Sequence, residues 1–133
     1  DYKDIVEWFK EVQYEEDIFV YKIGYDSWSA TYLVNDLRSE FGEKSCEPVI
    51  QGMKTLSSPM QSLGADIKSK KVNYGNNPIL VWCLNNVSAE RDKNNNVKPI
   101  KMSNTKKRID GFASLLDAYV IYENHIDDYL NLI

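Results

Sequence analysis

The fold is set by residues 19–28, which read FVYKIGYDSW. β-Branched and aromatic side chains dominate the first seven positions, and they predict a buried strand that closes on Asp26. Ser27 can cap a helix that begins at once and ends at Gly42. A second short strand is expected at Glu47–Gln51. The stretch therefore predicts a strand–helix–strand unit with an acidic residue at the end of its first strand.

Further helices are indicated on both sides of this unit. Residues 2–15 carry apolar side chains at helical spacing between charged ones. Another helix is expected to start at Ser57 or Ser58 as N-cap with Pro59 in its first turn, and Pro78 is expected to open a further one. The alternation of helices with strands favours an α/β fold with parallel strands and helices on the sheet faces.

A β-hairpin and a last helix complete the expected elements. Val87–Arg91 and Val97–Met102 flank Asp92–Asn96, where asparagines that tolerate left-handed backbone angles favour a hairpin turn. Asn104 or Thr105 is expected to cap the last helix, which carries a long apolar face.

Composition limits the kinds of site that the chain can build. Its 133 residues fit one domain over residues 1–133, and we expect this chain to be a piece of a longer polypeptide. No stretch has the roughly 18 consecutive apolar residues of a membrane span. Cys46 and Cys83 stand apart as expected buried free thiols, and His125 is the single histidine. Zinc-ligand spacing is therefore absent, and any metal must be a hard cation held by carboxylates.

Two acids stand where such a cation could bind. Asp26 follows a strand, and ligands bind in open α/β sheets at the ends of strands. Asp110 follows three basic residues near the start of the last helix. Taken alone, Asp26 is better explained by helix capping and Asp110 by the helix dipole. Together they indicate a two-metal phosphodiesterase site, which needs carboxylates from different elements.

Ordered motifs around these acids resemble the nuclease half of the large terminases of tailed bacteriophages. The resemblance runs from Asp1 to Tyr122. Its motifs are IGYDSW at 23–28, QG at 51–52, LSSPM at 56–60, NPIL at 77–80 with Trp82, NN at 85–86, KPIK at 98–101 and RIDG at 108–111.

The resemblance implies an RNase H-like mixed sheet flanked by helices, with an added β-hairpin and without the opening strands of that fold. It implies that acidic residues bind Mg2+ or Mn2+ and cleave double-stranded DNA. Asp26 matches the second acidic ligand of the family and Asp110 its late ligand, so both are the expected catalytic and metal-binding residues. The first ligand lies on a strand that precedes Asp1 in the family. We therefore expect the two-metal site to be incomplete and this chain alone to be weakly active or inactive.

Binding partners follow from the same resemblance and from local charge. Lys101, Lys106, Lys107 and Arg108 are candidates for contacts with DNA phosphates, with a solvated basic turn as the alternative. The resemblance implies the portal protein and the small terminase subunit as partners, in the host cytoplasm. The missing strands would also leave a sheet edge open to self-association.

The sequence contains other acidic, aromatic and histidine residues, which we expect to have structural roles. Asp117 lies two helical turns after Asp110 on the same helix face, so it could approach the site, but a solvated acid is the expectation. Trp28 and Trp82 are expected in the core. His125 is expected on the surface near the C-terminus. The alternative function is a non-catalytic remnant of the same fold that binds DNA or a protein.

Overall fold

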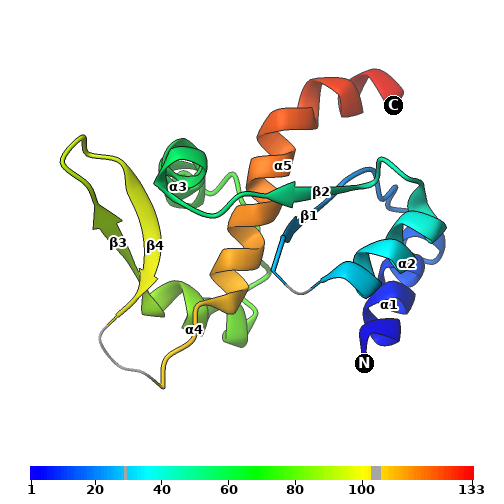
Figure 1. The fold of residues 1–133 in the computed structure, drawn as a ribbon, viewed down its shortest axis with the longest axis horizontal. Helices are drawn as coiled ribbons and strands as arrows, with labels where there is room; N and C mark the ends of the chain where they lie inside the picture. The colour runs from blue at the N-terminus through cyan, green and yellow to red at the C-terminus, as the bar shows by residue number, and fades with distance from the viewer. Residues whose placement is uncertain (29, 103–105) are drawn as a thin grey trace.

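The computed structural model describes residues 1–28, 30–102 and 106–133. Figure 1 shows the long last helix running through the middle of the molecule, with two helices and the parallel strands on one side and the hairpin on the other. The elements are α1 Tyr2–Tyr14, β1 Ile23–Asp26, α2 Thr31–Phe41, β2 Cys46–Val49, α3 Met53–Lys68, α4 Pro78–Asn86, β3 Val87–Arg91, β4 Val97–Lys101 and α5 Asp110–Leu132.

The predicted parallel pairing of the first two strands is confirmed. β1 and β2 pair in parallel register from Ile23 opposite Cys46 to Asp26 opposite Val49. The ladder begins at Ile23, so residues 19–22 of the predicted strand lie outside it. Within the described residues β1 pairs with β2 alone, and its other edge is open. The α/β class and the separate hairpin agree with the expected fold.

Two predicted helix starts are wrong. α2 begins at Thr31, and its N-cap Ala30 makes no side-chain capping bond, so Ser27 does not cap it. Its end at Gly42, with a positive φ of 106°, is as expected. α3 begins at Met53 after Gly52, and Pro59 therefore lies inside the helix. At both places the helix begins after a residue that makes no side-chain capping bond, so the capping residues in the sequence did not mark the helix starts.

The residue expected to cap α3 makes a contact that is distant in sequence. The hydroxyl of Ser57, which the sequence indicated as a cap, is buried and accepts a hydrogen bond from the Val97 N–H at 3.0 Å. This bond attaches the hairpin strand β4 to α3. Ser57 is therefore a tertiary contact inside the helix.

The expected helix start at Pro78 and the expected hairpin turn are both confirmed. The side chain of Asn77 caps α4 by accepting from the N–H groups of Ile79 and Leu80 at 3.0 and 3.1 Å. In the hairpin turn the Asp92 carboxylate accepts from the N–H groups of Asn94 and Asn96. Short-range polar bonds of this kind can be recognised in the sequence because both partners are close along the chain.

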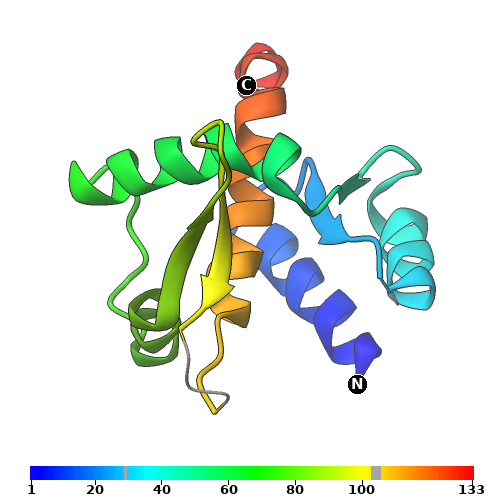
Figure 2. The ribbon, with the colours of Figure 1, turned by 60° about the vertical axis from the view of Figure 1, so that its left-hand side comes forward.

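The two sides of the molecule have separate apolar cores. One core joins β2, α3 and α5 and contains Val49, Leu56, Leu63, Phe112, Leu116, Tyr119, Val120 and Ile121. The second lies between α1, α2 and the strands and is built on Val34, Leu37 and Cys46. Figure 2, turned by 60°, shows the same division, with the hairpin and α3 separated from α2 by the strands and α5. α5 therefore holds the parallel strands and the side of the molecule that contains the hairpin in one arrangement.

The contact between β1 and α5 depends on Gly24. A Cβ atom at this position would lie 2.5 Å from Cγ1 of Ile121 and 2.9 Å from the carbonyl oxygen of Asp117. Both distances are shorter than real Cβ contacts allow, and one of the two atoms belongs to backbone that cannot turn aside. Only glycine therefore lets the strand lie this close to the helix.

Replacing Gly24 should weaken the whole fold. We expect Gly24→Ala to lower the free energy of unfolding by about 1–3 kcal/mol, the usual effect of overpacking. Gly64→Ala is the matched control, because a Cβ at Gly64 meets no atom within 4 Å and the residue lies inside α3. That change should be neutral or stabilise by up to about 1 kcal/mol. Urea denaturation measures both; equal stability of the two variants would contradict the packing argument.

Candidate active site

A groove of about 930 Å³ lies along β1 and is bounded by side chains of α1 and α5. Most of its wall is apolar, from residues such as Phe9, Val12 and Ile121. Asp26, Asp110, Asp117 and Gln51 also line it. The structure therefore brings both acids expected from the sequence to one groove.

Asp26 is the last residue of β1 and is exposed to solvent. Its Oδ1 accepts a hydrogen bond from the Trp28 N–H at 3.3 Å, which turns the chain away from the sheet after the strand. The helix that follows starts five residues later, at Thr31. Capping of α2 does not account for this acid, and its carboxylate is available at the strand end.

Asp110 is the first residue of α5 and is also exposed. The N-cap is Ile109, which makes no side-chain capping bond, while the expected caps Asn104 and Thr105 lie outside the described residues. A carboxylate in the first turn is stabilised by the helix dipole. Asp110 therefore stands where a negative charge is favoured and faces the same groove as Asp26.

Asp117 is not the solvated acid that the sequence suggested, because only 9% of its surface is exposed. Gln51, which follows β2, donates from Nε2 to Oδ1 of Asp117 at 3.1 Å. Burial raises the pKa of Asp117, the Gln51 bond lowers it, and repulsion from Asp26 raises it further, with a net increase. The clue in the sequence was its position among the apolar residues of the last helix.

A basic turn, Lys106 to Arg108, leads directly into α5, and Lys101 ends β4. Lys101, Lys106 and Arg108 are exposed and Lys107 is partly buried. The buried Asn86 donates from Nδ2 to the Arg108 carbonyl at 3.0 Å and so fixes this turn to the end of α4. The four predicted phosphate contacts therefore lie close in sequence to Asp110.

The expected burial of two tryptophans is wrong. Trp28 is 82% exposed and Trp82 is 44% exposed. Trp28 follows Asp26 in the turn before α2, where neither core reaches it. The aromatic type of these residues did not reveal their place because burial depends on the elements packed around them.

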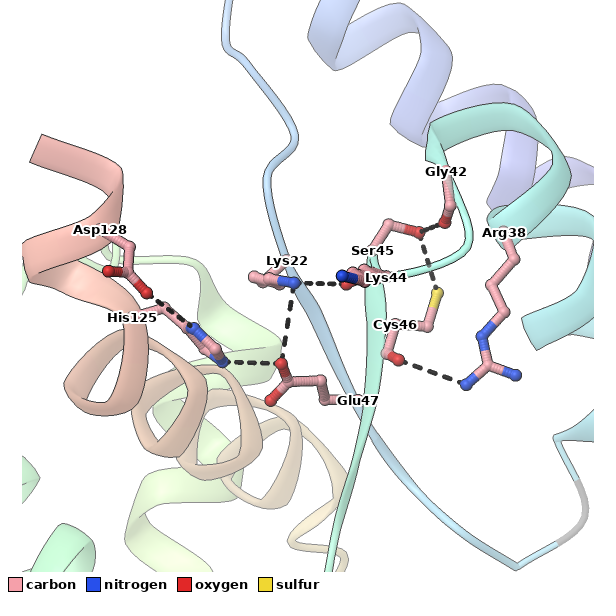
Figure 3. A network of polar contacts seen from close by, with 9 residues as sticks. All are labelled: Lys22, Arg38, Gly42, Lys44, Ser45, Cys46, Glu47, His125 and Asp128. Atoms are coloured by element: carbon pink, nitrogen blue, oxygen red, sulfur yellow. Dashed lines mark hydrogen bonds and ion pairs between the residues drawn. The ribbon is translucent and has the colours of Figure 1, made fainter. Parts of the chain in front are cut away.

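His125 belongs to a polar network at the other end of α5, shown in Figure 3. Its Nε2 lies 2.7 Å from Oε1 of Glu47, and Lys22 Nζ lies 3.7 Å from the same oxygen. Lys22 also donates to the Lys44 carbonyl. His125 lies fifteen residues after Asp110, about 22 Å along the helix axis. It therefore ties α5 to β2 and is remote from the Asp110 end of the groove.

The described residues contain no group of three or more His, Cys, Asp or Glu side chains arranged to hold a metal ion. Cys46 and Cys83 are buried free thiols, as expected. No helix in the described part of the chain is both long and apolar enough to span a bilayer.

The sequence matches the family described as terminase large subunit, endonuclease domain, over residues 1–125. The chain belongs to this family. A curated relative, protein YmfN of Escherichia coli strain K12, is 33% identical over 115 residues, which cover 78% of this chain and 25% of YmfN.

Among solved structures the HK97 bacteriophage large terminase has the same fold. The superposition gives a TM-score of 0.73 at 21% sequence identity and covers 91% of this chain and 25% of that one. The chain thus spans about a quarter of the length of each protein that it resembles.

The buried acid makes stability depend on pH in a definable way. Because the pKa of Asp117 is raised in the folded protein, the native state keeps its proton above the ordinary value of 3.8, whereas the unfolded state loses it. The free energy of unfolding therefore falls as pH rises from that value through the raised pKa. Asp117→Asn removes this effect, so the variant should be more stable than wild type at about pH 7.

Chemical denaturation of both proteins at several pH values between about 4 and 7 measures the difference. The stability gap should widen as pH rises. A constant gap over this range would mean that Asp117 titrates alike in the folded and unfolded states.

Proposed function

We propose that this chain is the DNA-cleaving part of a phage large terminase, a divalent-metal-dependent endonuclease that cuts concatemeric double-stranded DNA during genome packaging. The observation that carries the proposal is the shared groove of Asp26 and Asp110, beside a basic turn, in a member of the terminase endonuclease family. Strand-end and helix-start carboxylates are suitable ligands for two-metal phosphodiester hydrolysis. We further propose that residues 1–133 all belong to one nuclease domain.

The donor atoms fit Mg2+ or Mn2+, because carboxylate oxygens are the ligands that hard cations prefer. Asp26 and Asp110 would hold the ions, which supply water activation and stabilisation of the leaving oxygen when bound. The described residues contain no group of three or more His, Cys, Asp or Glu side chains arranged to hold a metal ion, so we propose Asp26 and Asp110 as a part of the ligand set. In the family that the chain resembles, another acidic ligand lies on a strand that precedes the region matched by Asp1.

The basic side chains have a separate task. Lys101, Lys106, Lys107 and Arg108 would bind backbone phosphates and hold a duplex against the Asp110 end of the groove. The bond from Asn86 to the Arg108 carbonyl keeps part of this turn in place before DNA arrives. Positioning by phosphate contacts carries no base specificity, which suits an enzyme that cuts many sequences.

Assembly partners are part of the same proposal. The portal protein and the small terminase subunit are expected from the resemblance, with action in the host cytoplasm. In the part of the chain that the structure describes, no strand pairs with the second edge of β1, and an apolar groove lies along this strand, so a strand could add there. Such a strand could come from the polypeptide of a whole terminase, or from a second copy in self-association.

Asp26→Asn and Asp110→Asn test the catalytic acids. With Mn2+, the full chain should nick supercoiled plasmid slowly, because its ligand set is incomplete, and each variant should lose this activity by about 100-fold or more. Agarose gels with an excess of protein over plasmid measure the rate.

Asp36→Asn is the matched control, since Asp36 is an exposed acid on α2 that does not line the groove. It should cut like wild type. Unchanged cleavage by both site variants would reject the catalytic assignment, and rapid cleavage by wild type would show that the acids of this chain are sufficient for activity.

The basic residues are tested by the salt dependence of DNA binding. Lys101→Ala and Lys107→Ala should each weaken binding of a duplex oligonucleotide and lower the slope of log affinity against log salt by about 0.9 per lost phosphate contact. Lys70→Ala, an exposed lysine after the end of α3, is the control and should leave the slope unchanged. Fluorescence anisotropy at several salt concentrations gives these slopes; equal slopes in all variants would contradict the phosphate role.

A further inference from the structure

Asp117 is an unusual residue for the interior of a small domain. Its carboxylate is nine-tenths buried on α5, and burying a charge is strongly unfavourable unless it is paired. Gln51 donates a hydrogen bond to Oδ1 of Asp117 at 3.1 Å, and among the described residues no cation is paired with the acid. A single bond from a neutral amide compensates only a part of the lost hydration.

The charge nearest to Asp117 makes the arrangement less favourable still. β1 packs directly on α5 at Asp117, since a Cβ on Gly24 would lie 2.9 Å from the Asp117 carbonyl oxygen. Asp26 ends the same strand two residues later, and the two carboxylates repel each other. Both side chains line the groove. Two neighbouring carboxylates, one of them buried, are stabilised when a cation lies between them.

Asp117 and Asp110 place carboxylates at two separate positions along α5. They are seven residues apart, so two helical turns place them on one side of α5 with about 10 Å of axial rise between them. Asp26, on the facing strand, shares the groove with both. A site for two metal ions requires oxygen ligands for each ion, and one α5 carboxylate cannot supply both ends.

We propose that Asp117 is a third carboxylate of the site and binds a divalent metal ion together with Asp26. The inference rests on the proposed nuclease function and adds a ligand to it. Gln51 is a positioning residue, because its amide holds one oxygen of Asp117 and leaves the other for the ion. The chain keeps an acid that destabilises the fold without metal because that acid is used when metal is bound.

Mn2+ titration of the full chain by isothermal calorimetry tests the assignment. We expect Asp117→Asn to weaken Mn2+ binding by at least about tenfold, as Asp26→Asn should also do. Asparagine has the shape of aspartate and its amide oxygen can still accept from Gln51. Asp36→Asn, an exposed acid of α2 outside the groove, is the matched control and should bind Mn2+ like wild type.

Thermal melting with and without Mn2+ separates a ligand from a structural role. A ligand binding to the folded state raises its melting temperature. In the absence of metal, Asp117→Asn should melt no lower than wild type, while the rise caused by Mn2+ should be lost. A variant that melts lower without metal and keeps the full rise would overturn the inference.

The outcomes also distinguish this inference from the proposed function. If Asp26→Asn loses Mn2+ binding and Asp117→Asn keeps wild-type affinity, Asp117 is no ligand while the nuclease site stands. If Asp26→Asn and Asp110→Asn both keep wild-type affinity, the metal site itself is rejected and Asp117 with it.

Discussion

The close approach of β1 to α5 at Gly24 is the constraint on which the rest of the structure depends. There is no space for a side chain at this position, because Ile121 and the backbone of Asp117 fill it. This close contact fixes the position of β1 along α5. It therefore also fixes where Asp26, at the end of the strand, lies relative to the acids of α5. A packing requirement in the core and the geometry of the candidate site have the same origin.

Helix α5 connects two sides of the molecule that are built from distant parts of the sequence. Its Phe112 and Leu116 belong to the core that it shares with α3 and β2, while its Asp110 and Asp117 line the groove beside β1. The hairpin is attached to α3 through Ser57, and the basic turn is attached to α4 through Asn86. These bonds hold the basic residues on the same framework as the acids, so that positive and negative groups keep a fixed relation.

The sequence predicted those features that depend on neighbouring residues. The start of α4 at Pro78, the hairpin turn over Asp92–Asn96 and the amphipathic α1 all arise from short-range contacts or periodicity, and all three are present. The predicted starts of α2 and α3 were wrong, and in α3 the Ser57 hydroxyl that was expected to cap the helix accepts a tertiary hydrogen bond from the Val97 N–H. The burial of Asp117 was missed although it stands among apolar residues of the last helix, because its surroundings are made by Gly24 and Gln51, which lie more than sixty residues away along the chain. Asp26 and Asp110 were singled out by their places at a strand end and a helix start, and then by the ordered motifs around them.

The stability of the fold and the chemistry of the site place opposite demands on this groove. A domain selected for stability alone would fill it with apolar side chains and would keep no buried acid at Asp117. It would also cover the open edge of β1. Asp110 differs, because the dipole of α5 stabilises its carboxylate where it stands. The unfavourable features are thus concentrated on β1 and its facing residue. Among the described residues a strand edge without a pairing strand, a buried acid and a second acid lie together, and a bound cation and an added strand would each remove part of the cost.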